Sequence, residues 1–281
     1  MEVRIDNLTV CDRTEKPGVL WKRTKGWVKG LLRAGDGPDH VLRNITCEFT
    51  SGVSVILGPN GSGKTVLIKV LAGLIPQDSG TIRIDGKTAD PAALRRLIGY
   101  LPQSFGLYPQ ATTREMLHYV ALLKGMVDRR TRECSVERVI EQTGLALLAD
   151  RKVGVFSRGM RQKVGIAQTL LGDPSLLLLD EPTAGLDPEE RNKLRGLLAE
   201  VGQDRLVIWV TSLIPDAGSA DRILVLNRGE NRFYGTPAEL TAYARCQPAE
   251  TVIAGEGASE ARWEEALTQG YRWVLAGQVS K

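Results

Sequence analysis

The sequence predicts an α/β fold in which helices cover both faces of a mostly parallel sheet. Short apolar runs alternate with longer segments of helical periodicity along most of the 281 residues, and this alternation is typical of parallel sheets. The run at 176–179 consists of leucines alone, as expected of a central strand that is buried on both faces. A helix-rich block at about 104–165 interrupts the alternation, so we expect an inserted helical subdomain.

Composition and charge narrow the class of protein. An apolar fraction of 42% and a charged fraction of 25% are ordinary for a globular protein. The net charge of +4 is too small to argue for nucleic acid as a partner, and we expect none. The cysteines are widely spaced and form no C-x-x-C pair, so the sequence indicates neither a zinc site nor a disulfide framework.

Direct insertion into a membrane is not expected. No window reaches the roughly 18 apolar residues of a membrane span, and the charged, alternating N-terminus is unlike a signal peptide. If the protein works at a membrane, we therefore expect it to act through a partner or to lie on the surface.

The chain opens with a strand, expected at 2–10 because Val3, Ile5 and Leu8 lie near strand spacing. An unusual insert follows at about 11–40. On a helix, the segment from Leu20 to Arg33 would place its apolar residues on one face and its basic residues on the other. Two interpretations stay open: a helix in an anionic lipid interface with tryptophans at headgroup level, or a helix whose apolar face packs on its own domain.

The other elements follow from the same periodicities. Strands are expected at 41–49, 53–57, 81–84, 97–101, 176–179, 207–210 and 223–226. Helices are expected at 66–72, 113–123, 136–143, 160–171, 189–201 and 237–244. The tail beyond Cys246 changes character, with a joint at 255–257, and it is too short for an independent domain.

A glycine-rich loop between strand 53–57 and helix 66–72 is the central motif. This phosphate loop comprises Gly58, Pro59, Asn60, Gly61, Ser62, Gly63, Lys64 and Thr65. Its glycines let backbone N–H groups point inward, and the helix that follows adds its positive dipole end. Lys64 supplies a charge to terminal phosphates, and the Thr65 hydroxyl can ligate Mg²⁺. An ordinary Gly-rich turn is the alternative, which the flanking strand and helix argue against.

Two carboxylates, Asp180 and Glu181, end the leucine strand. Side chains at the carboxyl end of a parallel strand face the ligand crevice of such folds. We expect Asp180 to hold Mg²⁺ through water and Glu181 to orient or deprotonate the attacking water. The alternative is a strand-ending turn, helped by Pro182.

Three further segments complete a pattern. S-R-G-M-R-Q at 157–162, hereafter the signature segment, precedes Asp180; P-T-A-G-L-D-P at 182–188 follows Glu181; and Gln103 lies between the phosphate loop and the signature segment. Together they resemble the ATP-binding-cassette (ABC) ATPases, the nucleotide-binding subunits of transporters, over roughly 1–244. The resemblance implies a P-loop NTPase (RecA-like) core with an N-terminal antiparallel β part, a helical subdomain, and a short extension at 245–281.

The resemblance also implies a dimer with ATP at the interface. Two subunits would stack head to tail, so that the phosphate loop of one faces the signature segment of the other. Gln103 would reach Mg²⁺ and the attacking water. The residues of the signature segment that would contact the partner's nucleotide are Ser157, Gly159 and Met160.

The forms of the signature segment and of 182–188 look most like exporter subunits, whose membrane permease is usually a separate chain. The resemblance implies that ATP hydrolysis powers export through that permease, and that the permease docks on the helical subdomain. The subunit would then lie peripherally at the cytoplasmic face of the cell membrane. The alternatives are a soluble ABC ATPase without a transport role and an ATP-sensing regulatory module.

The chain departs from the family pattern at the nucleotide site. Ser212 stands where the family usually has a histidine that touches the γ-phosphate. Val66 replaces a hydroxyl residue that bonds the α-phosphate, and Cys11-Asp12 occupies the place of an adenine-stacking aromatic. We expect weakened hydrolysis with ATP binding retained. A heterodimer with a second ATPase is open, but a homodimer is favoured because Glu181 is present.

Overall fold

The structure is a computed structural model that describes residues 1–11, 40–88, 97–242 and 260–276. The amphipathic segment from Leu20 to Arg33 and the joint at 255–257 lie outside the described residues. Within these ranges, no helix has the length and apolar character needed to cross a membrane.

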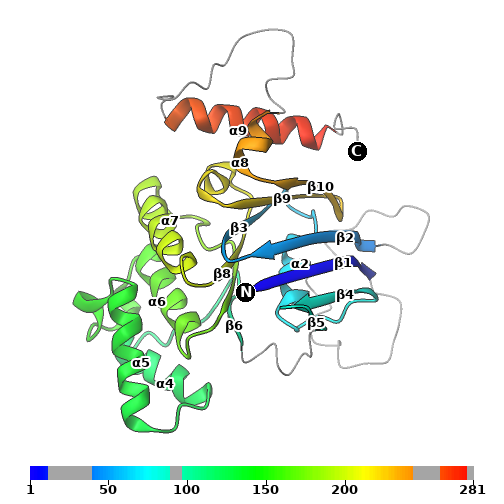
Figure 1. The fold of residues 1–281 in the computed structure, drawn as a ribbon. Coiled ribbons are helices and arrows are strands. Elements are labelled where there is room, and N and C mark those ends of the chain that lie inside the picture. Colours follow the sequence, from blue (N-terminus) through cyan, green and yellow to red (C-terminus); the bar gives the residue numbers. More distant parts are fainter. Residues whose placement is uncertain (12–39, 89–96, 243–259, 277–281) are drawn as a thin grey trace.

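The described elements alternate much as the sequence predicts (Figure 1). The strands are β1 (Glu2–Cys11), β2 (His40–Thr50), β3 (Gly52–Leu57), β4 (Ser79–Ile84), β5 (Lys87–Thr88), β6 (Ile98–Leu101), β7 (Leu176–Asp180), β8 (Leu206–Thr211), β9 (Arg222–Asn227) and β10 (Glu230–Gly235). The α-helices are α2 (Lys64–Leu71), α4 (Thr113–Leu123), α5 (Arg129–Gln142), α6 (Arg158–Leu170), α7 (Pro188–Gly202), α8 (Pro237–Ala242) and α9 (Glu260–Leu275). The 3₁₀ helices are η2 (Ala146–Leu148), η3 (Val153–Val155) and η4 (Ile214–Ser219).

A six-stranded sheet forms the centre, in the order β10-β9-β3-β8-β7-β6. Its strands from β9 to β6 run parallel, and β10 adds antiparallel to β9. Every residue of β7 and of β8 is buried, which is why both read as continuous apolar runs. The predicted fold class is therefore confirmed, and the carboxyl ends of β3, β7 and β8 meet at one edge.

A smaller antiparallel sheet, β2-β1-β4-β5, forms the second layer. Its inward residues, among them Ile5, Ile45 and Phe49, share an apolar core with α2 and with one face of the central sheet. Helices α6 and α7 pack on the opposite face of the central sheet, where a second apolar core also includes α4, α5 and α9. Helix α2, which follows the phosphate loop, is thus held between the two sheets.

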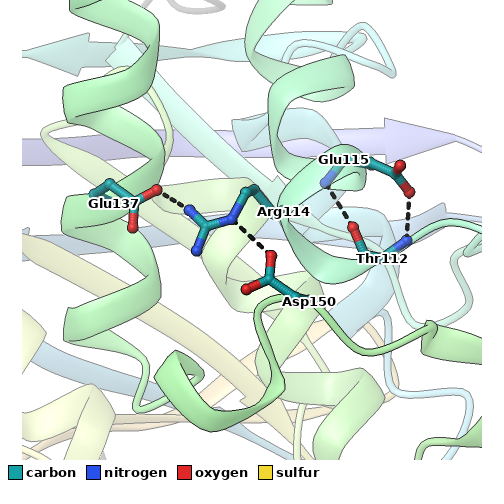
Figure 2. A network of polar contacts seen from close by, with 5 residues as sticks. All are labelled: Thr112, Arg114, Glu115, Glu137 and Asp150. Carbon is teal, nitrogen blue, oxygen red and sulfur yellow. Dashed lines mark hydrogen bonds and ion pairs between the residues drawn. The ribbon is translucent and has the colours of Figure 1, made fainter.

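The helical subdomain is tied together at the start of α4 (Figure 2). Arg114 pairs with Glu137 of α5 and donates to Asp150 at 2.9 Å, so one guanidinium links α4, α5 and the segment after η2. Thr112 and Glu115 form a reciprocal capping box that fixes where α4 begins. Because these groups are partly exposed, their main effect is to fix geometry rather than to add much stability.

Several element boundaries differ from the prediction for identifiable reasons. Helix α5 begins at Arg129 instead of 136, because Asp128 caps it by accepting from Thr131 N at 2.7 Å, and its first turns are polar. Strand β10 was not predicted because it is a largely polar edge strand. Helix α9 was also missed, although its residues Leu267 and Val274 are buried in the core.

Candidate functional site

The phosphate loop connects β3 to α2 through backbone conformations that favour glycine. Gly61 has a φ of 80° and Gly63 a φ of 100°, both in the left-handed region. A Cβ added to Gly63 would lie 2.7 Å from Leu42 Cδ2 and 2.9 Å from Val41 O. A Cβ on Gly58 would collide with the carbonyl oxygen of Leu226. The loop is therefore pressed against β2 and the end of β9, with no room for a side chain at Gly58 or Gly63.

Lys64 is folded into the loop that it follows. Its Nζ donates to Gly58 O at 2.6 Å and to Pro59 O at 3.0 Å, and only 6% of the residue is exposed. Burial lowers the pKa of Lys64, while the nearby carboxylates of Glu181 and Asp180 act in the opposite direction. The loop thus holds a cation against its own backbone carbonyls, as expected of a group that meets terminal phosphates.

Thr65 and Asp180 bring a hydroxyl and a carboxylate together. Thr65 Oγ1 donates to Asp180 Oδ1 at 3.3 Å. Asp180 Oδ2 is buried, and among the described residues it has no hydrogen-bond partner. Burial raises the pKa of Asp180 to about 6, and this rise is moderated by the Thr65 bond and by Lys69 and Lys64. An unpartnered carboxylate oxygen beside a hydroxyl is a donor set that fits Mg²⁺.

Glu181 and Ser212 meet at the ends of the neighbouring strands β7 and β8. Glu181 has a φ of 51°, in the left-handed region that a glutamate rarely adopts. Its N–H donates to Val210 O at 2.9 Å, which ties it to β8. Ser212 Oγ lies 3.5 Å from Glu181 Oε2. A strained residue held by its surroundings is a recurrent feature of functional sites, and the structure brings Ser212 close to it.

The signature segment lies at the start of α6. Ser157 caps this helix, because its Oγ accepts from Met160 N at 3.2 Å. The same Oγ donates to Glu190 Oε1 at 3.3 Å, and the Glu190 carboxylate fills the space above Gly159. The structure therefore groups Ser157, Gly159 and Met160 at one helix N-terminus. No hydrogen bond or ion pair between described residues joins this group to the phosphate loop.

The remaining site residues lie at the margins. Gln103 is exposed just beyond the end of β6. Val66 is half-buried and packs against the core between the two sheets, which gives a structural reason for an apolar side chain there. Sequence reasoning missed Glu190 and the buried Asp216. Both are polar groups whose partners lie elsewhere in the fold, so no local pattern marks them.

Comparisons with known proteins show the family to which the chain belongs. The family described as "ABC transporter" matches residues 42–184. The "Probable multidrug ABC transporter ATP-binding protein YbhF" of Escherichia coli (strain K12) is 39% identical over 219 residues, which are 76% of this chain and 38% of YbhF. The chain thus matches well under half of that relative's length.

Two other known proteins are similar to this chain over most of their own length. The "Linearmycin resistance ATP-binding protein LnrL" of Bacillus subtilis (strain 168) is 32% identical over 214 residues, which are 74% of this chain and 68% of LnrL. The solved structure of cbiO1 from Clostridium perfringens, part of the ABC transporter complex cbiONQ, superposes with a TM-score of 0.69 and 26% identity. It covers 85% of this chain and 90% of cbiO1.

Proposed function

The chain belongs to the ABC transporter family and is an ATPase of that family, and from this premise we propose that it binds and hydrolyses ATP to power export through a separate transmembrane permease. The observation that carries the proposal is the convergence of Lys64, Thr65, Asp180 and Glu181 where β3 and β7 end. The alternatives, a non-transport ABC ATPase and an ATP-sensing module, are outcomes of the tests below.

In this proposal the phosphate loop and Lys64 bind the triphosphate. Thr65 and Asp180 would hold Mg²⁺, with Gln103 reaching toward it from the end of β6. When bound, Mg²⁺ would neutralise charge that develops on the phosphate oxygens. Glu181 would orient the attacking water and accept its proton. Two observations support this role: the Glu181 carboxylate lies near enough to Lys64 to act on its pKa, and its strained backbone is typical of functional sites.

Ser212 lowers the rate of ATP hydrolysis that we expect. Its hydroxyl donates to Glu181 Oε2 over a long distance of 3.5 Å and carries no charge. It can therefore help to orient Glu181 but cannot offer the cation that a histidine would offer to the γ-phosphate. We propose that the chain hydrolyses ATP more slowly than a relative with histidine at this position.

The signature segment would serve the ATP of a second subunit. Ser157 and Gly159 lie at the N-terminus of α6, where backbone N–H groups and the helix dipole favour an anion. We propose that ATP closes a head-to-tail dimer and that hydrolysis opens it. A homodimer is favoured because Glu181 is present in this chain; a heterodimer would be the conclusion if ATP bound without self-association.

The helical subdomain would receive the permease. Its exposed face carries Tyr108 and Tyr119, whose rings meet edge to face at 6.0 Å. They line a hollow of about 420 Å³ together with Ala111, Glu115 and Met116. Exposed aromatic rings around a hollow suit the docking of a partner helix. The names of YbhF and LnrL, which refer to multidrug transport and to linearmycin resistance, support export. The subunit would then be peripheral, at the cytoplasmic face of the membrane.

Two assays test the proposal. Purified wild-type chain should bind and hydrolyse ATP, Glu181→Gln should bind without hydrolysis, and Lys64→Ala should lose binding. Membranes from cells that express the chain should retain it after a high-salt wash, and Tyr108→Glu should release it. Release of the wild-type chain by salt alone would indicate electrostatic contact with lipid, as expected if the segment from Leu20 to Arg33 were the anchor. That result would contradict permease docking.

A further inference from the structure

A buried carboxylate, Asp216, lies between the two loops that carry Glu181 and Ser212. It belongs to η4, and its exposed fraction is 0%. Its Oδ2 accepts hydrogen bonds from Thr183 Oγ1 at 2.5 Å and from Thr211 Oγ1 at 2.8 Å. Thr183 follows Glu181 and Pro182 in the chain, and Thr211 immediately precedes Ser212. A single oxygen therefore joins the two loops.

The surrounding backbone makes this junction stiff. Thr211 Oγ1, which donates to Asp216, also accepts from Leu213 N at 3.0 Å and so closes the turn around Ser212. On the other side, Ala184 N donates to Glu181 O at 3.2 Å, which closes the turn that contains Thr183. Because both threonines are fully buried, neither hydroxyl can exchange its partner for water.

Packing from outside holds η4 in place. Arg195 donates to Pro215 O at 2.7 Å. Helix α9 contacts η4 directly, and a Cβ added to Gly218 would lie 3.3 Å from Trp263 Nε1. In Figure 1, α9 (red) lies across the side of the molecule formed by α8, β9 and β10, far from the helical subdomain. The C-terminal helix thus supports the η4 segment from which Asp216 reaches the site.

We propose that Asp216 is a positioning residue for ATP hydrolysis. By accepting hydrogen bonds from Thr183 and Thr211 with one oxygen, it holds Glu181 and Ser212 in place relative to each other. The inference rests on the proposed function, in which Glu181 acts on the attacking water. Glu181 has a strained φ that only its surroundings can maintain. Ser212 is exposed, so its place is set by the buried threonine before it. Loss of the junction misplaces both groups without touching the phosphate loop.

The test compares two substitutions of Asp216. Both hydrogen bonds end on the same oxygen, so Asp216→Asn can keep them, whereas Asp216→Leu removes both and keeps the branch at Cγ with a larger side chain. We expect Asp216→Leu to lower kcat roughly tenfold or more, Asp216→Asn to stay within about threefold, and the ATP Kd of both to stay within about twofold. The matched control is Asp221→Leu. Asp221 accepts from Val53 N at 2.7 Å at the opposite end of β3, so kcat should not change.

A second readout does not depend on turnover. Amide hydrogen exchange should quicken in both 181–187 and 211–216 in Asp216→Leu, mainly in the first in Thr183→Val, and mainly in the second in Thr211→Val. Equal loss of kcat in Asp216→Asn and Asp216→Leu would overturn the inference, as would unchanged kcat or unchanged exchange in Asp216→Leu. Glu181→Gln separates the role of Glu181 in hydrolysis from the positioning role of Asp216. If this variant still hydrolyses ATP, the proposed function is contradicted, and the exchange data still test Asp216.

Discussion

Replacing Ser212 with histidine should raise the rate of ATP hydrolysis. Ser212 Oγ lies 3.5 Å from Glu181 Oε2, at the long end of hydrogen-bond distances, so Ser212→Ala should cost no more than about 1 kcal/mol, or roughly fivefold in kcat. A histidine at this position would offer the γ-phosphate a cation that serine lacks, and two opposite unit charges about 4 Å apart gain about 4 kcal/mol at an effective dielectric constant near 20. Because Ser212 is exposed, solvent screening reduces this gain to no more than about 1 kcal/mol, or roughly fivefold in kcat.

The assay is steady-state phosphate release at saturating ATP and Mg²⁺, with the ATP Kd measured separately. Ser219→His is the matched control, because Ser219 is an exposed serine at the end of η4, the 3₁₀ helix that follows Ser212, and it has no hydrogen bond to Glu181 within the described residues. We expect Ser212→His to exceed the wild-type kcat and Ser219→His to equal it. The reasoning is refuted if Ser212→His is no faster than wild type, or if Ser219→His is faster by the same factor.

Three further predictions concern Gly63 of the phosphate loop, Lys124 beside the end of α6, and Asp180. Gly63→Ala should abolish ATP binding and lower Tm, because its φ is 100° and the new methyl would meet Leu42 Cδ2 at 2.7 Å; titration with a fluorescent ATP analogue measures the first effect. Lys124→Met should lower the free energy of unfolding by about 2–4 kcal/mol in urea, since Lys124 Nζ donates to Gln168 O, Thr169 O and Leu171 O at 2.9, 3.1 and 2.7 Å where α6 ends. Burial raises the pKa of Asp180 to about 6, above the roughly 3.9 of an unfolded aspartate, so the folded state binds more protons in between. The unfolding free energy should therefore fall as pH rises from about 4 to about 6, and Asp180→Asn should lack this fall in urea titrations across that range.

The predictions for Gly63 and Lys124 each have a control in the chain. Gly86→Ala changes a glycine with a φ of 76° that has open space around it, so it isolates backbone strain from collision. Lys152→Met removes an exposed lysine that makes one long contact of 3.5 Å. A control that matched its test variant would contradict the structural explanation of that variant.

The sequence predicts elements well where burial is uniform. The leucine run of β7 and the apolar run of β8 are buried throughout, so composition alone identifies them. Helix α4 has the predicted bounds because a capping box marks its start. The start of α5 was missed since its cap, Asp128, precedes a run of arginines that carries no apolar period. Helix α9 was missed because its burial depends on contacts with α8 and η4, and no local sequence pattern predicts those contacts.

The candidate site divides in the same way. The motifs predict roles for Lys64, Thr65, Asp180 and Glu181 from sequence alone, and the structure brings these four residues together. The place of Asp216 in the site cannot be predicted from a local motif. It bonds two threonines because β7 and β8 are neighbours in the sheet, and strand order is a property of the whole fold. The strain at Glu181 is likewise a backbone property that residue type does not predict.

The association state of Glu181→Gln in the presence of ATP tests the central claim most directly, since that claim is a composite site built from two copies of this chain. In sedimentation experiments, Glu181→Gln should be monomeric without nucleotide and dimeric with ATP and Mg²⁺. Combining it with Lys64→Ala or with Ser157→Arg should keep it monomeric. A Glu181→Gln chain that binds ATP and stays monomeric would contradict a composite site built from two copies of this chain.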